Sequence, residues 1–136
     1  MLARVLFHQG DLETALLLAE EEPFVLMRLT ARAIIHHALG NLLESKAALD
    51  TMIGEYQQVA GIYISLVYVV RGDAERALEW MEKGAETEGP EILATNWYAP
   101  EFKVLYGDPR WEKLLTRAGV SQQQLAEIEF DIPPTE

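Results

Sequence analysis

The sequence predicts an all-α fold, a solenoid of about three degenerate helical hairpins followed by a C-terminal helical cap. The first observation is the spacing of Gly10, Gly40 and Gly72, which lie 30 and 32 residues apart. The second is their context, because each glycine ends an apolar stretch and precedes Asp or Asn. The third is a small residue five positions after each glycine, which is Ala, Ser and Ala in turn and is expected where the two helices of a hairpin approach closely. A fixed period in the thirties is typical of stacked helical hairpins that cannot bury their apolar faces alone.

Each glycine is expected to mark the tight turn of one hairpin. Glycine relieves the strain of the left-handed position that ends a helix, and the Asp or Asn after it can cap the next helix with its side-chain oxygen. The helices are therefore expected at about residues 2–8, 12–21, 24–38, 42–53, 57–70, 74–86, 91–98, 101–106, 109–118 and 122–129.

The segment from Ile62 to Val70 is ambiguous by itself, because a β-branched and aromatic apolar run also suits a buried strand. It stands directly before Gly72, where the other repeats have a helix, and this position favours a helix. In 24–38 the apolar side chains recur at helical intervals.

The pattern changes after Gly89. Asp108 and Pro109 are typical of a helix start, Gly119 of its end, and Ser121 opens a capping box for a last helix. Repeat arrays need atypical ends that hide their last apolar face. We therefore divide the chain into repeats (1–88), a helical cap (89–130) and a disordered tail (131–136).

The composition of the chain excludes several classes of partner and of metal site. The chain has 136 residues, 49% of them hydrophobic, and a formal net charge of -11. This acidity argues against nucleic acid and anionic membranes as partners, since both require a basic surface. The longest apolar run, Val59 to Val70, has 12 residues, whereas a membrane-spanning helix needs roughly 20. The sequence contains no Cys, which excludes disulfides and thiolate metal sites. We expect a cytoplasmic protein without cofactor or metal.

The hairpins resemble the tetratricopeptide repeat, which implies a right-handed solenoid. In this sequence the resemblance covers about residues 1–88. The residues that carry it are Leu2, Ala3, Leu6, Ala15 and Ala19 in the first hairpin, Leu29, Ala33, His36, Ser45 and Leu49 in the second, and Ile64, Ser65, Tyr68, Ala77 and Met81 in the third. The period is shorter than the usual 34 residues, and the terminal Pro is missing after the second and third hairpins.

The stretch from Asp108 to Val120 resembles the closing segment of tetratricopeptide-like regions in bacterial regulatory proteins. There such regions accompany winged-helix, cyclase or kinase domains. Because the chain begins inside a hairpin, this resemblance implies the C-terminal part of a larger protein. A true N-terminus with a short first helix is the alternative.

No catalytic residues are expected. His36 and His37 are neighbours on a helix and diverge by about 100°, so they cannot chelate one ion. The acidic side chains of Glu79, Glu82 and Glu86 are typical of a solvated helix face, and no phosphate-binding loop or catalytic triad is present. A set of aromatic residues could form a cage for a cation, or fill the junction between the last repeat and the cap; these are Trp80, Trp97, Tyr98, Phe102, Tyr106 and Trp111.

The resemblance places the partner-binding groove on the inner face of the first helix of each hairpin. Its residues would be Arg4, Phe7, His8, Met27, Thr30, Ile34, His37, Val59, Ile62, Tyr63, Leu66 and Val70. Relatives that clamp the C-terminal carboxylates of chaperones carry Lys, Asn and Arg in this groove, whereas Thr30, Ile34, Ile62 and Leu66 stand at the matching positions here. The clamp is therefore absent, and Ile34, Ile62 and Leu66 are expected to form one stripe.

An apolar groove of this kind needs a cover, since large exposed apolar patches mark partner sites. The cover could be the 91–129 segment, a second copy of the chain in a homodimer, or an amphipathic helix of another protein. The sequence thus predicts a non-catalytic protein–protein interaction or scaffold module. The alternative is a sensor domain that binds a small apolar ligand near Tyr63, Trp97 and Phe102.

Overall fold

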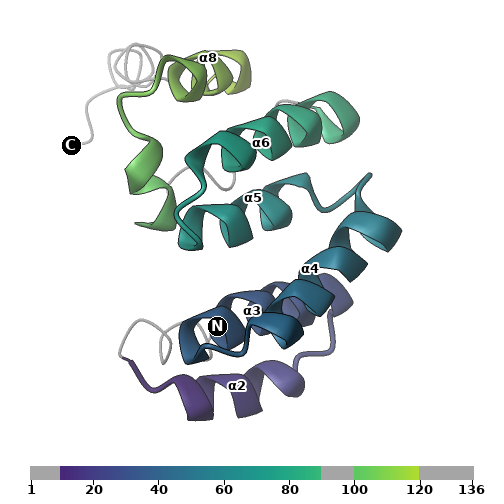
Figure 1. Cartoon of the computed structure of the whole chain (residues 1–136). Helices are drawn as coiled ribbons and strands as arrows, with labels where there is room; N and C mark the ends of the chain where they lie inside the picture. Colours follow the sequence, from purple (N-terminus) through teal and green to yellow (C-terminus); the bar gives the residue numbers. More distant parts are fainter. Residues whose placement is uncertain (1–9, 90–99, 120–136) are drawn as a thin grey trace, which may run out of the picture.

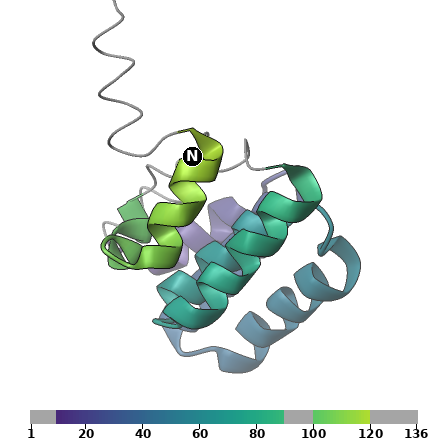
Figure 2. The ribbon, with the colours of Figure 1, turned by 90° about the horizontal axis from the view of Figure 1, so that it is seen from above.

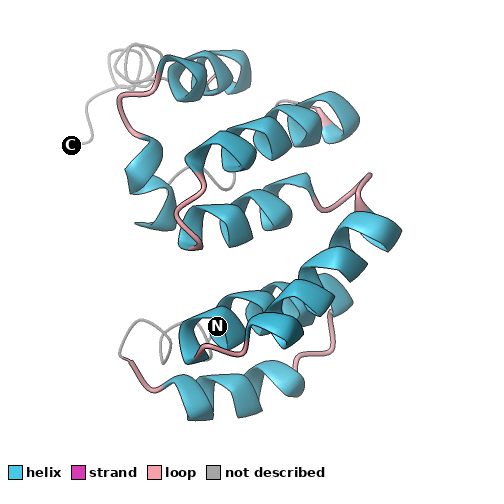
Figure 3. Cartoon of the chain, viewed as in Figure 1, coloured by secondary structure: helices cyan, strands magenta, loops and turns pink. Residues whose placement is uncertain are grey.

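The computed structural model describes residues 10–89 and 100–119, and the regular elements in these ranges are all helical (Figures 1 and 3). They are α2 (Leu12–Glu20), α3 (Val25–Leu39), α4 (Leu42–Tyr56), α5 (Gly61–Val70), α6 (Ala74–Glu88), the 3₁₀ helix η1 (Pro100–Leu105) and α8 (Pro109–Ala118). The expected helices 2–8, 91–98 and 122–129, the capping box at Ser121 and the tail 131–136 lie outside the described residues.

The three glycine turns are confirmed. Gly10, Gly40 and Gly72 have φ angles of 85°, 84° and 81°, in the left-handed region that favours glycine. Asp11 caps α2 by accepting a hydrogen bond from the Thr14 backbone N–H at 3.3 Å. Asp73 caps α6 in the same way, accepting from the Arg76 N–H at 3.1 Å.

The turn between α3 and α4 departs from this scheme. Asn41 precedes α4, but its side chain makes no capping hydrogen bond. Its Nδ2 atom instead lies 3.2 Å from Nδ1 of His36, in the last turn of α3. The expected side-chain cap is therefore wrong at this turn, where the Asn41 side chain contacts His36 instead.

Two expected helix boundaries are also wrong. The helix predicted to end at residue 53 continues to Tyr56, since Met52 is fully buried and Tyr56 packs against the same apolar cluster. The helix predicted from residue 57 consequently begins only at Gly61. The expected helix 101–106 is the short 3₁₀ helix η1, which starts at Pro100.

Consecutive helices pack as antiparallel hairpins, α3 with α4 and α5 with α6, and α2 packs against α3 (Figure 1). Helices α3 and α5, the first helices of successive hairpins, also contact each other. The small residues Ala15, Ser45 and Ala77 are all 0% exposed. These positions therefore lie in the packed interior, where a larger side chain would have to displace its neighbours.

A close approach of two helices joins α5 to α6. A Cβ atom built on Gly61 would lie 2.7 Å from Cα of Gly84 and 2.9 Å from the carbonyl oxygen of Trp80. The two glycines therefore allow the backbones of α5 and α6 to touch where α5 begins.

The apolar interior forms separate clusters. We call the one formed by α5, α6, η1 and α8 the cap cluster; its buried members include Leu78, Met81, Phe102 and Trp111. We call the one formed by α3, α4 and α5, with Trp80 of α6, the middle cluster. A smaller one joins Ala15 and Ala19 of α2 to Ile35 of α3. Figure 2 shows α8 beside α6, where it covers the end of the array.

Candidate interaction surface

Four of the predicted groove residues lie on α3. Met27, Ile34 and His37 are half-buried, so part of each side chain is accessible. Thr30 is only 6% exposed, and its hydroxyl donates a hydrogen bond to the Leu26 carbonyl oxygen at 2.6 Å. The Thr30 hydroxyl is therefore paired within its own helix and leaves little surface exposed.

The predicted groove residues of the third hairpin differ widely in exposure. Val59 is 49% exposed and lies just before α5, whereas Tyr63, Leu66 and Val70 are half-buried. Ile62 is only 5% exposed and belongs to the cap cluster. The remaining predicted residues, Arg4, Phe7 and His8, lie outside the described part of the chain.

The stripe expected from Ile34, Ile62 and Leu66 is divided between two clusters. Ile34 packs against the middle cluster, together with Tyr63. Ile62 and Leu66 pack in or against the cap cluster. The α5 helix therefore turns one side toward α3 and another toward the cap.

The described part of the cap covers Ile62 and the neighbouring surface of α5. Phe102 and Leu105 of η1 and Trp111 and Leu114 of α8 are each 1–2% exposed and share the cluster with Ile62. Three covers were considered for the groove. Over the third hairpin, the structure shows one of them, which is the chain's own C-terminal segment. It leaves half-exposed side chains on α3.

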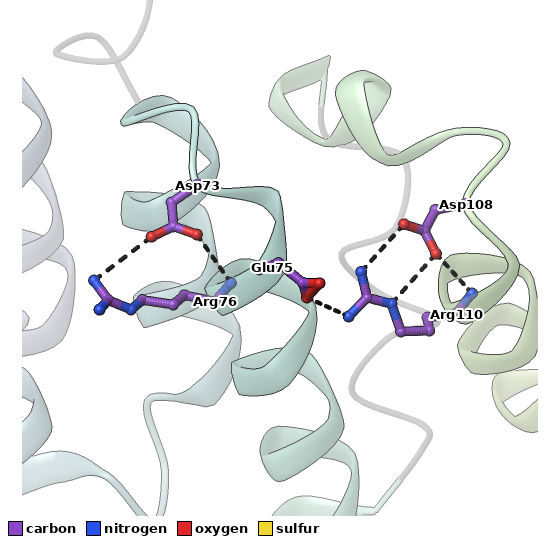
Figure 4. Close-up of polar contacts among 5 residues, drawn as sticks. All are labelled: Asp73, Glu75, Arg76, Asp108 and Arg110. Atoms are coloured by element: carbon purple, nitrogen blue, oxygen red, sulfur yellow. Dashed lines mark hydrogen bonds and ion pairs between the residues drawn. The ribbon is translucent and has the colours of Figure 1, made fainter.

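The cap is also held by charged groups, drawn in Figure 4. Nη1 of Arg110 in α8 lies 2.6 Å from Oε2 of Glu75 in α6, and the Arg110 guanidinium also contacts Asp108. The Asp108 carboxylate accepts from the Arg110 backbone N–H at 2.9 Å, capping α8 as predicted. This backbone hydrogen bond and the Arg110 side chain lower the pKa of Asp108, whereas Glu75 and Asp108 raise the pKa of Arg110.

Among the aromatic residues that the structure describes, Trp80, Phe102 and Trp111 are buried in the apolar clusters, whereas Tyr106 is exposed. The ring centroids of Phe102 and Trp111 are 5.8 Å apart, and those of Tyr106 and Trp111 are 5.7 Å apart. Trp80 belongs to the middle cluster, where Nζ of Lys83 lies 4.4 Å from its ring centroid. Trp97 and Tyr98 are outside the described residues.

Within residues 10–89 and 100–119, no group of three or more His, Cys, Asp or Glu side chains is placed to hold a metal ion. Glu20 pairs with Arg32, whose hydrogen bond lowers the pKa of the Glu20 carboxyl. Glu79 and Glu86 are exposed on α6. None of the helices in these ranges is long and apolar enough to cross a membrane.

One polar arrangement was missed by sequence reasoning. Arg71, the C-terminal cap of α5, reaches back to Ser45 in α4 and donates a hydrogen bond to its Oγ at 2.6 Å. The available signal was Ser in place of Ala at the small position of the second hairpin, which we interpreted only as a packing residue. The arginine directly before Gly72 was the second residue in the sequence that could have indicated this hydrogen bond.

Comparison with known proteins gives one family. A family model of the tetratricopeptide repeat matches residues 1–21, which include the first glycine turn and α2. This match supports the resemblance of the hairpins to the tetratricopeptide repeat. No curated protein and no solved structure matches the chain significantly. Repeats of this family suggest a protein–protein interaction module.

Proposed function

We propose that the chain is a non-catalytic interaction module of a larger bacterial regulatory protein in the cytoplasm, and that it binds another protein or a second copy of itself. The tetratricopeptide-repeat match supports the interaction role. The likeness of the segment from Asp108 to Val120 to closing segments of bacterial regulators supports the larger context.

The observation that carries this proposal is the partial exposure of inner-face side chains on two neighbouring first helices. Met27, Ile34 and His37 of α3 and Tyr63 and Val70 of α5 are all half-buried, and the two helices are in contact. Each side chain therefore retains apolar area that a partner could cover. Burial of such area contributes about 25 cal/mol per Å².

An amphipathic helix is the partner that suits this surface. Such a helix presents apolar side chains at intervals of three and four residues, which fit between the side chains of two packed helices. The same face of a second copy would supply a helix of this kind in a homodimer.

Binding of a small apolar ligand between the third hairpin and the cap is less well supported. Such a ligand would have to displace Phe102 and Trp111, which are 1% and 2% exposed and in ring contact. Tyr63, the third residue expected to line that site, packs against the middle cluster and not the cap cluster.

The proposal can be tested by introducing a negative charge on α3, within the proposed surface, and on α2, outside it. We expect Met27→Glu to abolish self-association in sedimentation velocity, or capture of a partner from bacterial extract, while the melting temperature stays near that of wild type. Leu17→Glu is the matched control, because Leu17 is 70% exposed on α2, a second helix. Equal binding by the wild type and Met27→Glu, or equal loss in both variants, would show that the inner face is not the interface.

A further inference from the structure

Arg71 joins the third hairpin to the second through a chain of two hydrogen bonds. Its Nη2 donates to Oγ of Ser45 at 2.6 Å, across 26 positions of sequence. The Ser45 hydroxyl in turn donates to the carbonyl oxygen of Ala33 in α3. Because its only hydrogen is committed to Ala33, the hydroxyl can act toward Arg71 only as an acceptor. The guanidinium is thus held in one orientation from another hairpin.

This half-buried cation lacks a carboxylate partner within the described residues. Its Nε atom is buried and has no hydrogen-bond partner, and no ion pair of Arg71 is found. Asp73, two residues away, is engaged with the backbone N–H and the guanidinium of Arg76. Partly buried charges in proteins are ordinarily paired, because an unpaired one loses hydration without compensation.

The free end of the guanidinium is suited to an oxyanion. Nη1 makes no hydrogen bond to the described residues and, unlike Nε, is not among the buried atoms without a partner. Nη1 and the second hydrogen of Nη2 form the planar fork that binds a carboxylate or phosphate through two parallel hydrogen bonds. Since the hydrogen bond to Ser45 already restricts the side chain, less side-chain entropy is lost on binding.

We infer that Arg71, oriented by Ser45, is the recognition site for a carboxylate of a partner polypeptide. That the carboxylate belongs to a partner polypeptide rests on the proposed function, whereas the binding of a carboxylate by Arg71 does not. A carboxylate suits the site better than a phosphate, because Glu44 is next to Ser45 and Asp73 is two residues from Arg71 in the sequence. Their negative charges repel a doubly charged phosphate more strongly than a singly charged carboxylate. The site lies at the hairpin turn, directly after Val70, the last residue of α5.

The experiment uses the full chain, labelled for NMR observation of arginine side-chain Nε–Hε resonances. Sodium acetate is added against sodium chloride at matched ionic strength and neutral pH, and sodium phosphate is added in a parallel series. We expect a saturable shift of the Arg71 resonance with acetate, and little change at Arg76, which already has Asp73. Arg71→Lys, read from the backbone amides around Ser45, should bind acetate about tenfold more weakly, since it lacks the planar fork.

Each outcome either supports or overturns the inference about Arg71. Saturable acetate binding at Arg71 that is lost in Arg71→Gln supports the inference, whether or not Met27→Glu affects association. Equal, non-saturable shifts at Arg71 and Arg76 would overturn it and leave Arg71 as a structural tie between hairpins. Binding of phosphate without acetate would overturn the assignment to a carboxylate. In Arg71→Gln, a lower melting temperature alone would report the structural tie, so unfolding and anion binding are measured separately.

Discussion

The contact between Gly61 and Gly84 gives the sharpest prediction, because it concerns backbone atoms that cannot move aside. A methyl group at Gly61 would lie 2.7 Å from Cα and 2.9 Å from N of Gly84, and 2.9 Å from the Trp80 carbonyl oxygen. Distances below 3.0 Å require α5 and α6 to separate. We therefore expect Gly61→Ala to lower the free energy of unfolding by about 1–3 kcal/mol, the usual range for overpacking.

Gly54→Ala is the matched control, and we expect the opposite sign. Gly54 lies within α4, has no atom within 4 Å of an added Cβ and does not adopt a positive φ. Alanine is favoured over glycine inside a helix by about 1 kcal/mol, so this variant should be more stable than wild type.

Urea unfolding followed by circular dichroism measures both variants under identical conditions. If Gly61→Ala were as stable as wild type while Gly54→Ala gained stability, the reasoning from the α5–α6 contact would be refuted. If both variants gained stability equally, helix propensity alone would govern the two sites.

Three further predictions test the turns and the cap. Gly72→Val forces a β-branched residue to a φ of 81° and should cost about 1–2 kcal/mol in urea unfolding, so wild-type stability would contradict the left-handed turn. Leu66→Glu places a carboxylate against the cap cluster and should cost about 1–3 kcal/mol by the same measurement, whereas an unchanged unfolding curve would mean that the cap does not cover Leu66. The pKa of Asp108 is lowered in the folded state, so its contribution to stability is complete above the ordinary value of 3.8 and is lost as the pH falls through the folded pKa. Melting curves should therefore show a steeper acid loss for wild type than for Asp108→Asn, and parallel losses would refute the role of Arg110.

The local turn chemistry could be predicted from sequence because it depends on neighbouring residues. Glycine at a left-handed position followed by Asp leaves few alternatives, and Gly72 and Asp73 adopt the expected geometry. Pro109 after Asp108 similarly marked the start of α8. Asn41 was the exception, since its side chain had a competing partner in His36 that the pattern did not reveal.

The surface was harder to predict because burial depends on contacts between distant segments. Repeat position alone made Ile62 an inner-face residue, but η1 and α8 cover it, and no periodicity in α5 reveals their docking. The Arg71–Ser45 hydrogen bond spans two hairpins and is equally invisible to a local pattern. Ser45 was identified correctly as a small buried residue, but its hydroxyl chemistry emerges only from packing.

Trp80 gives α6 a role in the cooperativity of unfolding. This side chain enters the middle cluster, whereas Leu78 and Met81 of the same helix enter the cap cluster. Unwinding α6 would therefore expose both interiors at once, so neither cluster can open through α6 without disturbing the other. We expect the amide hydrogens of α6 to exchange at the rate of global unfolding, as a helix shared by two interiors should. Amides near Trp80 that exchanged as fast as those at the start of α2 would contradict this coupling.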